Sequence, residues 1–364
     1  MKHSRFLVVS SLLLGAAFAA SCARAGAEMR SADGTDEHTS TPADAESNTV
    51  AANASSDDAV VIGEGAHRYR WVKNWGARPD GKDLGNTHGC VAHDSEGRIY
   101  VNTDTADAVM VYDASGKLLK TWGKDFAGGM HGMQIVKESE REFLYAVHTS
   151  RHEVVKCTLD GDVQWTVGWP ETSGVYEKKE QYNPTSIAVL PDGAFFVADG
   201  YGLSWIHKYD KDHKYVKSFA GPGTEPGKCR TPHGLLLDTR VTPPVLMVAD
   251  RENGRLQTFD LDGKFLSVIS GMLRRPCHMH LRGKELVVAD LAGRVTILNE
   301  KNELVCHLGD QPDESLRAQN GVPKEKWKDG VFLSPHCAEW DAKGDLYVLD
   351  WNASGRVSKL EHVK

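Results

Sequence analysis

A short pattern recurs along this chain of 364 residues. A histidine begins a stretch of strand-forming residues, a turn follows, and the next such stretch usually ends in Asp. The recurring histidines are His88, His131, His233, His278 and His336, and a further copy at Asn183-Pro184-Thr185 lacks the histidine. The steps from first to last average about 50 residues, a period typical of solenoids, propellers and other repeat arrays. We therefore expect the imidazoles to occupy equivalent places in successive units.

Each repeat has the sequence of four short strands. In the fourth unit these are residues 233–238, 245–250, 255–259 and 264–269, and the last two are joined by a turn that ends in Asp262-Gly263. Asp-Gly favours the backbone angles of a hairpin turn. Six such units fill residues 60–364, and four-stranded antiparallel units repeated radially predict an all-β fold, a six-bladed β-propeller.

The ends of the repeat region predict how the ring closes. The sixth unit lacks a fourth strand, whereas residues 69–76 resemble the fourth strands of other units, such as residues 117–123. We expect this N-terminal strand to pair with residues 355–360 and complete the last blade, which removes an exposed edge. Two insertions, residues 169–182 and 311–333, precede first strands and should gather on one face as a rim for a substrate.

The sequence before the repeats predicts export. Residues 1–21 have a basic start and an apolar run, as in a signal peptide. Ala19-Ala20-Ser21-Cys22 resembles a bacterial lipoprotein box, with Ala19 where Leu is usual, and predicts lipidation of Cys22. Ala17-Phe18-Ala19 fits ordinary signal peptidase as well. Residues 22–59 contain no aromatic residue and predict a disordered acidic tether. The protein would then reside in the periplasm or at the cell surface, touching the membrane only through a lipid anchor.

Charge and cysteine content exclude some classes of protein. The net charge of −7 argues against nucleic acid as a partner. Six cysteines follow Cys22, namely Cys90, Cys157, Cys229, Cys277, Cys306 and Cys337. None forms a CxxC pair, which argues against a zinc knuckle or a thioredoxin motif. Export would permit disulfides, but their pairing does not follow from sequence.

Three of the histidines are spaced for a metal site. His131, His233 and His336 belong to units two, four and six, with steps of 102 and 103 residues. In a six-bladed ring alternate first strands would place three imidazoles around the axis with an open position, as in catalytic metal sites. Zn²⁺ is the default ion, and another divalent transition metal would also suit imidazole. The alternative is that each histidine hydrogen-bonds a neighbouring backbone.

Other polar residues stand near the expected channel. Because five imidazoles cannot all ligate one tetrahedral ion, we expect His88 and His278 to contact the ligands or to line the channel. Neighbours in a strand face opposite ways, so Cys277 and Cys337 should not share the site with His278 and His336. Asp199, Asp250, Asp290 and Asp350 should accept backbone N–H groups of the following loop, Tyr201 could move a proton, Arg251 could bind a carboxylate, and His148 is structural or catalytic.

Several strings resemble a known family. Residues 248–255 (VADRENGR), 197–202 (VADGYG), Pro232-His233-Gly234 and Pro335-His336 resemble the NHL-repeat propeller of peptidyl-α-hydroxyglycine α-amidating lyase. The resemblance covers the whole repeat region. It implies a zinc ion on His131, His233 and His336, a catalytic Tyr201 and a nearby Arg251, in an enzyme that cleaves the N–C bond of an α-hydroxyglycine peptide to give a peptide amide and glyoxylate.

The chain departs from that family at two positions. Thr103-Asp104 stands where the family carries an essential arginine, and Asp104 would repel a carboxylate substrate. Cys337 stands where the family has an Asp that helps to hold a structural calcium, so we do not expect that calcium. The resemblance to the family therefore supports the metal site more strongly than it supports the family's substrate contacts.

Two function classes follow from these observations. The first is an exported, monomeric metalloenzyme, lyase-like or hydrolase-like, that acts on a small-molecule or peptide-derived substrate. The second is a non-catalytic, surface-tethered NHL propeller that binds a protein partner or serves as a scaffold, because fold alone does not determine function. A lactonase-type propeller is a weaker interpretation, since that class uses a carboxylate-rich calcium site.

Overall fold

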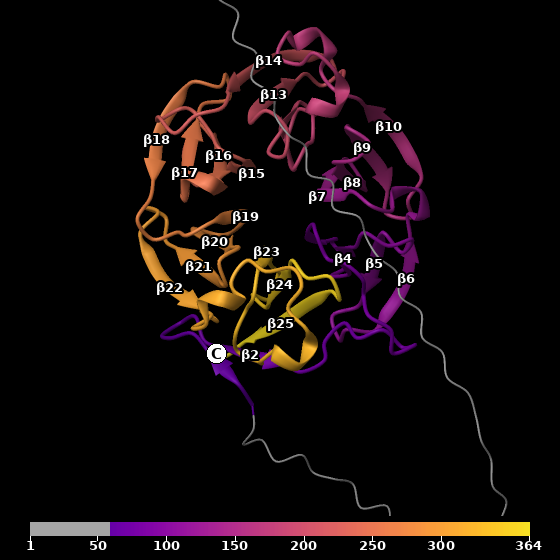
Figure 1. Ribbon diagram of the computed structural model, residues 1–364, viewed down its shortest axis with the longest axis vertical. Coiled ribbons are helices and arrows are strands. Elements are labelled where there is room, and N and C mark those ends of the chain that lie inside the picture. Colours follow the sequence, from indigo (N-terminus) through magenta and orange to yellow (C-terminus); the bar gives the residue numbers. More distant parts are fainter. Residues whose placement is uncertain (1–58) are drawn as a thin grey trace, which may run out of the picture. The chain divides into compact units, whose positions relative to one another are not determined.

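The structure, a computed structural model, describes residues 59–364, and this part of the chain forms a ring of six antiparallel sheets (Figure 1). These sheets are the blades of a propeller, so the predicted all-β, six-bladed fold is confirmed. First strands such as β7 (Met130–Glu138), β15 (Pro232–Asp238) and β19 (Pro276–Arg282) lie toward the centre of the ring, and fourth strands such as β6 (Leu118–Trp122), β10 (Val163–Val167), β18 (Phe265–Ile269) and β22 (Leu304–Leu308) lie at its perimeter. None of the helices in the described residues is long and apolar enough to cross a membrane.

The blades follow one another along the chain. Blades one and two consist of β3 (Val91–His93), β4 (Ile99–Asn102), β5 (Val109–Tyr112) and β6 (Leu118–Trp122), and of β7 (Met130–Glu138), β8 (Arg141–His148), β9 (Glu153–Thr158) and β10 (Val163–Val167). Blades three and four consist of β11 (Ser186–Val189), β12 (Phe195–Ala198), β13 (Trp205–Tyr209) and β14 (Tyr215–Ala220), and of β15 (Pro232–Asp238), β16 (Val245–Asp250), β17 (Arg255–Phe259) and β18 (Phe265–Ile269). Blade five consists of β19 (Pro276–Arg282), β20 (Glu285–Asp290), β21 (Arg294–Leu298) and β22 (Leu304–Leu308).

Blade six joins the two ends of the described chain. It contains β23 (Pro335–Trp340), β24 (Leu346–Asp350), β25 (Arg356–His362), β2 (Tyr69–Val72) and β1 (Val61–Ile62). Strand β2 is antiparallel to β25, with Trp71 opposite Leu360, so the predicted closing strand is confirmed. Strand β1 adds a fifth strand outside β2, which the repeat pattern did not predict because the other units have four.

Short 3-10 turns lie in the loops between strands. They are η2 (Lys124–Phe126), η3 (Glu171–Ser173), η4 (Lys179–Gln181), η5 (Arg251–Asn253), η6 (Glu314–Leu316) and η7 (Lys324–Lys326). Turns η3 and η4 belong to the insertion before β11, and η6 and η7 belong to the insertion before β23. Both insertions therefore lead into a first strand, and the second of these strands, β23, carries His336.

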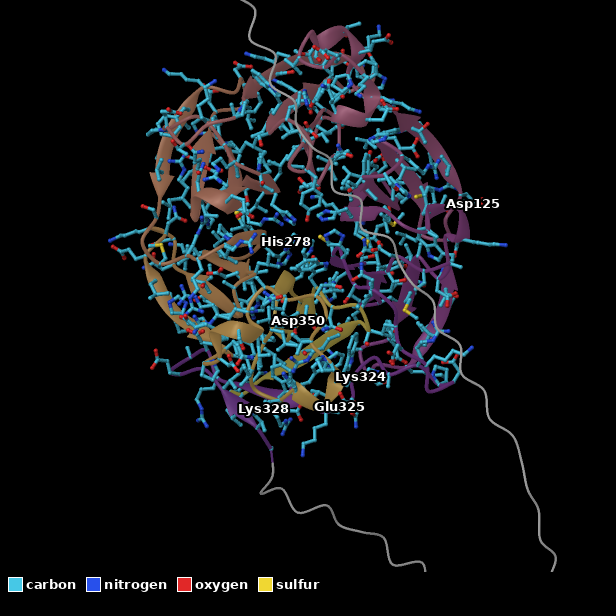
Figure 2. All side chains as sticks on the ribbon, in the orientation of Figure 1. Asp125, His278, Lys324, Glu325, Lys328 and Asp350 are labelled. Carbon is cyan, nitrogen blue, oxygen red and sulfur yellow. The ribbon has the colours of Figure 1, made fainter. Side chains whose placement is uncertain are left out.

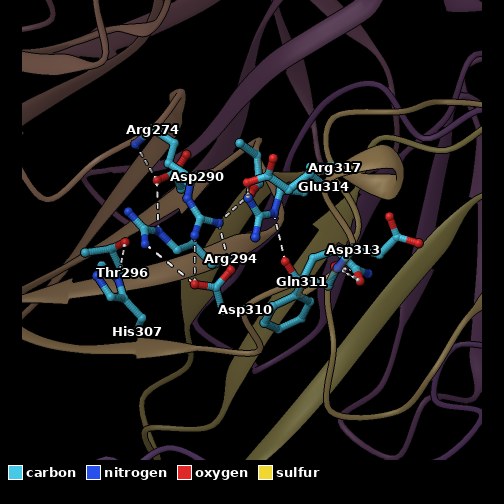
Figure 3. A network of polar contacts seen from close by, with 12 residues as sticks. Arg274, Asp290, Arg294, Thr296, His307, Asp310, Gln311, Asp313, Glu314 and Arg317 are labelled. Carbon is cyan, nitrogen blue, oxygen red and sulfur yellow. Dashed lines mark hydrogen bonds and ion pairs between the residues drawn. The ribbon is translucent and has the colours of Figure 1, made fainter.

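The aspartates that end the second strands fasten each blade to the loop that enters it. Asp290 accepts the amides of Arg274 and Arg275 at 2.7 and 2.6 Å, and Figure 3 shows the ion pairs from Arg274 and Arg294 that continue outward to Asp310. Equivalent amide contacts are made by Asp199, Asp250 and Asp350. The expected structural role is confirmed, but most of these amides precede the first strand and do not lie in the following loop. The reason is that antiparallel pairing brings the start of the first strand beside the end of the second.

Some sequence predictions lie outside the described residues. They are the signal peptide of residues 1–21, the lipidation site Cys22 and, up to residue 58, the acidic tether. All six cysteines that follow Cys22 lie within the described residues, and all six are buried free thiols.

Candidate metal centre

Three imidazoles meet on the axis from alternate blades. His131, His233 and His336 are the second residues of β7, β15 and β23, and they are 2%, 3% and 1% exposed. Their ring centroids are 4.6 to 4.9 Å apart. Each lies where the pairing register of its strand shifts, as at a β-bulge. A bulged residue leaves the ladder and can redirect its side chain, which explains why these histidines turn toward the axis.

Each of these histidines is oriented by the next blade. The Nδ1 atom lies 2.6 Å from the carbonyl oxygen of Thr185 for His131, 3.1 Å from that of Cys277 for His233, and 2.8 Å from that of Gly89 for His336. A carbonyl only accepts hydrogen bonds, so Nδ1 carries the proton and Nε2 keeps its lone pair.

The glycine that follows two of the histidines permits this contact. A side chain at Gly132 would lie 2.4 Å from the Thr185 oxygen, and one at Gly234 would lie 2.3 Å from the Cys277 oxygen. Any Cβ there would push the next blade away from the imidazole. The His-Gly pairs in the sequence thus reflect close approach of neighbouring blades.

The phenol of Tyr201 lies among the Nε2 atoms. Its Oη is 2.9 Å from Nε2 of His233, 3.3 Å from Nε2 of His131 and 3.1 Å from Nε2 of His88. Arg251 Nη1 donates a hydrogen bond to the same oxygen at 3.2 Å. One phenol proton can satisfy only one imidazole, and the buried Nε2 of His336 has no hydrogen-bond partner. The cluster therefore gathers more lone pairs than the protein supplies protons, which is the donor set that a metal ion requires.

Burial keeps the cluster uncharged. It holds the pKa of His131, His233 and His336 well below the ordinary value, and it lowers that of His88 to about 4, with Arg251 acting in the same direction. Burial also raises the pKa of Tyr201 to about 12, against the lowering effect of Arg251. Neutral imidazole is the form that ligates metals.

His88 belongs directly to this cluster. Its ring lies 4.9 Å from that of His131 and 5.1 Å from that of His336, and the ligand atoms of all three are within 4.8 Å of one another. His88 enters from one residue before Gly89, the residue whose carbonyl orients His336. It is therefore a fourth imidazole at the centre. His88 lies in the loop before β3, whereas the other three histidines are the second residues of their strands.

The expectation that five histidines occupy equivalent places was wrong for His278 as well as for His88. The prolines that begin β15, β19 and β23 each pair with the aspartate that ends their blade's second strand. Cys277, the residue after the second of these prolines, is thus the counterpart of His233 and His336. Its sulfur lies within 4.8 Å of their ligand atoms, so the exclusion of Cys277 from the site of His336 was also wrong.

The alternation within each strand nevertheless holds. His278 faces away from Cys277, donates Nδ1–H to the Ala338 carbonyl at 3.2 Å, and forms a separate group with Cys90 and Cys337. In Figure 2 its label lies near the centre of the ring.

Two further candidates lie outside the cluster. His148 contacts the Phe126 carbonyl through Nε2 at 3.2 Å and accepts the Arg151 amide at Nδ1, so both ring nitrogens have backbone partners. Asp104 is half-buried and accepts a hydrogen bond from Asn86 at 2.5 Å, and burial raises the pKa of its carboxyl. Neither residue lines the cavity that adjoins the cluster.

A cavity of about 240 Å³ adjoins the imidazoles. Its lining consists of His88, Tyr201, Arg251, Arg275, Leu291, His336 and Trp351. Sequence reasoning missed Leu291 and Trp351, although they directly follow second-strand aspartates, as Arg251 does. It also missed Arg275, which shares a carboxylate with Arg251: both donate to Glu252 Oε1, at 2.5 and 2.9 Å.

The fold and the imidazole cluster define a six-bladed propeller with a histidine-rich axis. NHL repeat-containing protein 3 of Mus musculus is 30% identical over 283 residues, which cover 72% of this chain and 76% of that protein. The chain belongs to this NHL-repeat family. Peptidyl-alpha-hydroxyglycine alpha-amidating lyase 1 of Drosophila melanogaster is also 30% identical, over 68% of this chain and 47% of that protein, so the chain spans about half of that relative's length.

Solved structures agree with the fold. A gluconolactonase of Xanthomonas campestris has a TM-score of 0.56 at 13% identity, covering 84% of this chain and 95% of its own. Virginiamycin B lyase of Staphylococcus aureus has a TM-score of 0.51 at 12% identity, covering 78% of this chain and 99% of its own. At this identity the likeness concerns the propeller alone. No protein-family model matches the sequence.

Proposed function

We propose that this protein is a metal-dependent carbon–nitrogen lyase of the amidating-lyase type, with its ion on His131, His233 and His336. The observation that carries the proposal is the set of Nδ1 contacts to the next blades, which leave three neutral Nε2 atoms free on rings whose centroids lie 4.6 to 4.9 Å apart. Zn²⁺ suits three imidazoles with an open position, and His88 stands close enough to serve as a fourth donor. When bound, such an ion would polarise a substrate oxygen.

Tyr201 and Arg251 supply the proton chemistry. For a substrate with a hydroxyl on the carbon beside an amide nitrogen, the hydroxyl loses its proton as its oxygen forms a carbonyl. The C–N bond breaks, and its electron pair remains on nitrogen, which takes up a proton. Tyr201 Oη, held at 3.2 Å by Arg251 Nη1, is the hydroxyl in the cluster that can exchange this proton with the substrate.

The substrate contacts differ from those implied by the family pattern. Asp104 replaces the blade-one arginine, but the cavity beside the imidazoles is lined by two guanidinium groups, Arg251 and Arg275. We propose that an anionic group of a small or peptide-derived substrate binds between them. Glu252 holds both arginines and leaves part of each guanidinium available for such a group.

Metal analysis tests the site. Protein purified without an affinity tag should lose one equivalent of bound zinc in the triple variant His131→Ala/His233→Ala/His336→Ala, while the control His148→Asn should keep it. Equal metal content in the wild type and the triple variant would contradict a metal site on these three histidines.

An activity assay tests the reaction. An α-hydroxyglycine peptide should be converted to amide and glyoxylate by wild-type protein and more slowly by Arg275→Ala. Protein that binds zinc but releases no glyoxylate, even as the Asp104→Arg variant, would contradict the lyase and leave a metal-binding, non-catalytic propeller.

We further propose that the protein is an exported monomer anchored at Cys22. Mass spectrometry of protein from the membrane fraction should find a lipid on Cys22, and Cys22→Ala should move the protein to the soluble fraction. An unmodified chain cleaved after Ala19 would show ordinary secretion instead.

A further inference from the structure

A second group of metal-ligating side chains lies on the other side of the strands that carry the imidazole cluster. Cys337 follows His336 in β23, and His278 follows Cys277 in β19, so strand alternation turns both away from the cluster. They meet Cys90, which directly precedes β3 of blade one. The ligand atoms of Cys90, His278 and Cys337 all lie within 4.8 Å of one another.

The two thiols are buried, His278 is half-buried, and hydrogen bonds orient Cys337 and His278. Cys90 is 5% exposed and Cys337 is fully buried. The Val91 amide donates to Cys337 Sγ at 3.2 Å, a contact that favours a thiolate on that sulfur. His278 uses Nδ1–H for the Ala338 carbonyl, which leaves its Nε2 lone pair for a ligand.

A polar cavity of about 140 Å³ adjoins this group. His278 lines it together with His93, His280 and Glu339. His93 Nδ1 contacts Glu339 at 3.0 Å, whereas its buried Nε2 has no hydrogen-bond partner. The cavity therefore reaches His278, the imidazole of this group, and also contains a further imidazole nitrogen without a partner.

We propose that Cys90, His278 and Cys337 form a second metal site, separate from the imidazole cluster, that binds one thiophilic ion, Zn²⁺ or Cu⁺. Two thiolates and an imidazole are a donor set for such ions and a poor one for Ca²⁺ or Mg²⁺. Binding would release the two thiol protons to solvent. Because both thiols must lose their protons to ligate the ion, the affinity should rise with pH.

This site would have a structural consequence. Cys90 belongs to blade one and Cys337 to blade six, which are adjacent in the ring but farthest apart in the sequence, and His278 adds blade five. An ion held by all three would join the first and last blades on the inner side, opposite the β2–β25 pairing at the outside. The proposal shares no ligand with the imidazole centre and stands whether or not the protein is a lyase.

Cobalt substitution tests the proposal, because only thiolate ligands give near-ultraviolet sulfur-to-cobalt charge-transfer absorption. Metal-free, reduced wild-type protein titrated with Co²⁺ should develop this absorption and lose it on addition of Zn²⁺, and in a parallel arm Cu⁺ should displace the cobalt. The absorption should vanish in Cys90→Ala/Cys337→Ala. It should persist in Cys157→Ser, which changes a buried cysteine elsewhere, and in Cys277→Ser, which changes the cysteine beside the imidazole cluster.

His278→Asn keeps both thiols and serves if the double variant fails to fold. It should weaken Co²⁺ binding at the thiolate site by more than about tenfold. Substitutions of residues that only contact the metal ligands already cause losses of this size. Three results would overturn the proposal: no charge-transfer absorption in the wild type, absorption lost only in Cys277→Ser, or a Cys90–Cys337 disulfide in peptide maps of the freshly purified protein.

Discussion

At the scale of single residues, the centre depends on side chains whose protonation is set by burial and backbone contacts. The Tyr201 hydroxyl contacts three Nε2 atoms and one guanidinium. So many polar groups around one oxygen would not be needed to stabilise a protein core. Buried polar clusters of this kind are expensive unless something satisfies them. The open Nε2 of His336 shows that the protein alone does not satisfy this one.

Replacing Tyr201 by Phe tests whether its hydroxyl takes part in the reaction. The variant removes one oxygen and leaves all four imidazoles, so zinc content should stay unchanged while kcat falls by about 10²–10⁴-fold, the usual range for a proton-transfer group. Steady-state kinetics with metal analysis on the same samples measures both. Tyr215→Phe is the matched control, and an unchanged kcat in Tyr201→Phe would show that the hydroxyl is not used.

The buried imidazole of His207, which lies outside the metal centre, should make the folded state less stable in acid. It is fully buried between Tyr176 and Ser218, and desolvation lowers its pKa to about 3. In the unfolded chain a histidine takes up its proton near pH 6.5, so the stability that His207 contributes is present above that pH. It is lost between pH 6.5 and about 3, at up to about 1.4 kcal/mol per pH unit.

Urea unfolding at pH 7 and pH 5.5 measures this loss. Other buried histidines also contribute to the change of the free energy of unfolding with pH. His207→Gln should reduce this change by the contribution of one bound proton. Equal slopes in the two proteins would contradict the assignment.

At the scale of elements, the closing strand β2 and the second-strand aspartates hold the blades in register. Trp71 of β2 is 6% exposed, packs 5.1 Å from the Phe332 ring and lies under the Arg356 guanidinium at 5.2 Å. It therefore secures both the pairing with β25 and the insertion before β23.

Truncation of this side chain should weaken ring closure. Trp71→Ala should lower the free energy of unfolding by about 3–5 kcal/mol, as for other buried aromatic truncations. The exposed residue Leu119 in β6 provides the comparison, since Leu119→Ala should change stability by no more than about 0.5 kcal/mol. Urea denaturation gives both values, and similar losses would mean that β2 does not secure the ring.

At the scale of the whole molecule, an axial ion would link blades that share no strand. The imidazole centre draws on blades two, four and six, whereas hydrogen bonds between neighbouring blades act only pairwise around the ring. A ligand that binds only the folded state stabilises it by mass action, by about 2.7 kcal/mol at one hundred times its dissociation constant.

Metal removal should therefore lower the melting temperature. Treatment of wild-type protein with a chelator should decrease Tm, and added zinc should restore it. The triple variant His131→Ala/His233→Ala/His336→Ala should respond less, because it keeps only the proposed thiolate site. A Tm that is insensitive to chelator in the wild type would argue against a bound ion at either place.

The sequence by itself determined the propeller, its six units, its closing strand and the three alternate histidines. Hydrophobic alternation, Asp-Gly turns and a period of about 50 residues are patterns that can be recognised in the sequence alone. Only the tertiary structure decided which side chains share a site. The same register shift begins β15, β19 and β23, and the residue after the proline is the one that faces the axis. In β19 that residue is Cys277, so His278, one position later, lies with Cys90 and Cys337, while His88 joins the cluster from just before β3. The recurring histidine is thus a local pattern, but the direction of each ring depends on bulges and on carbonyls of the neighbouring blade.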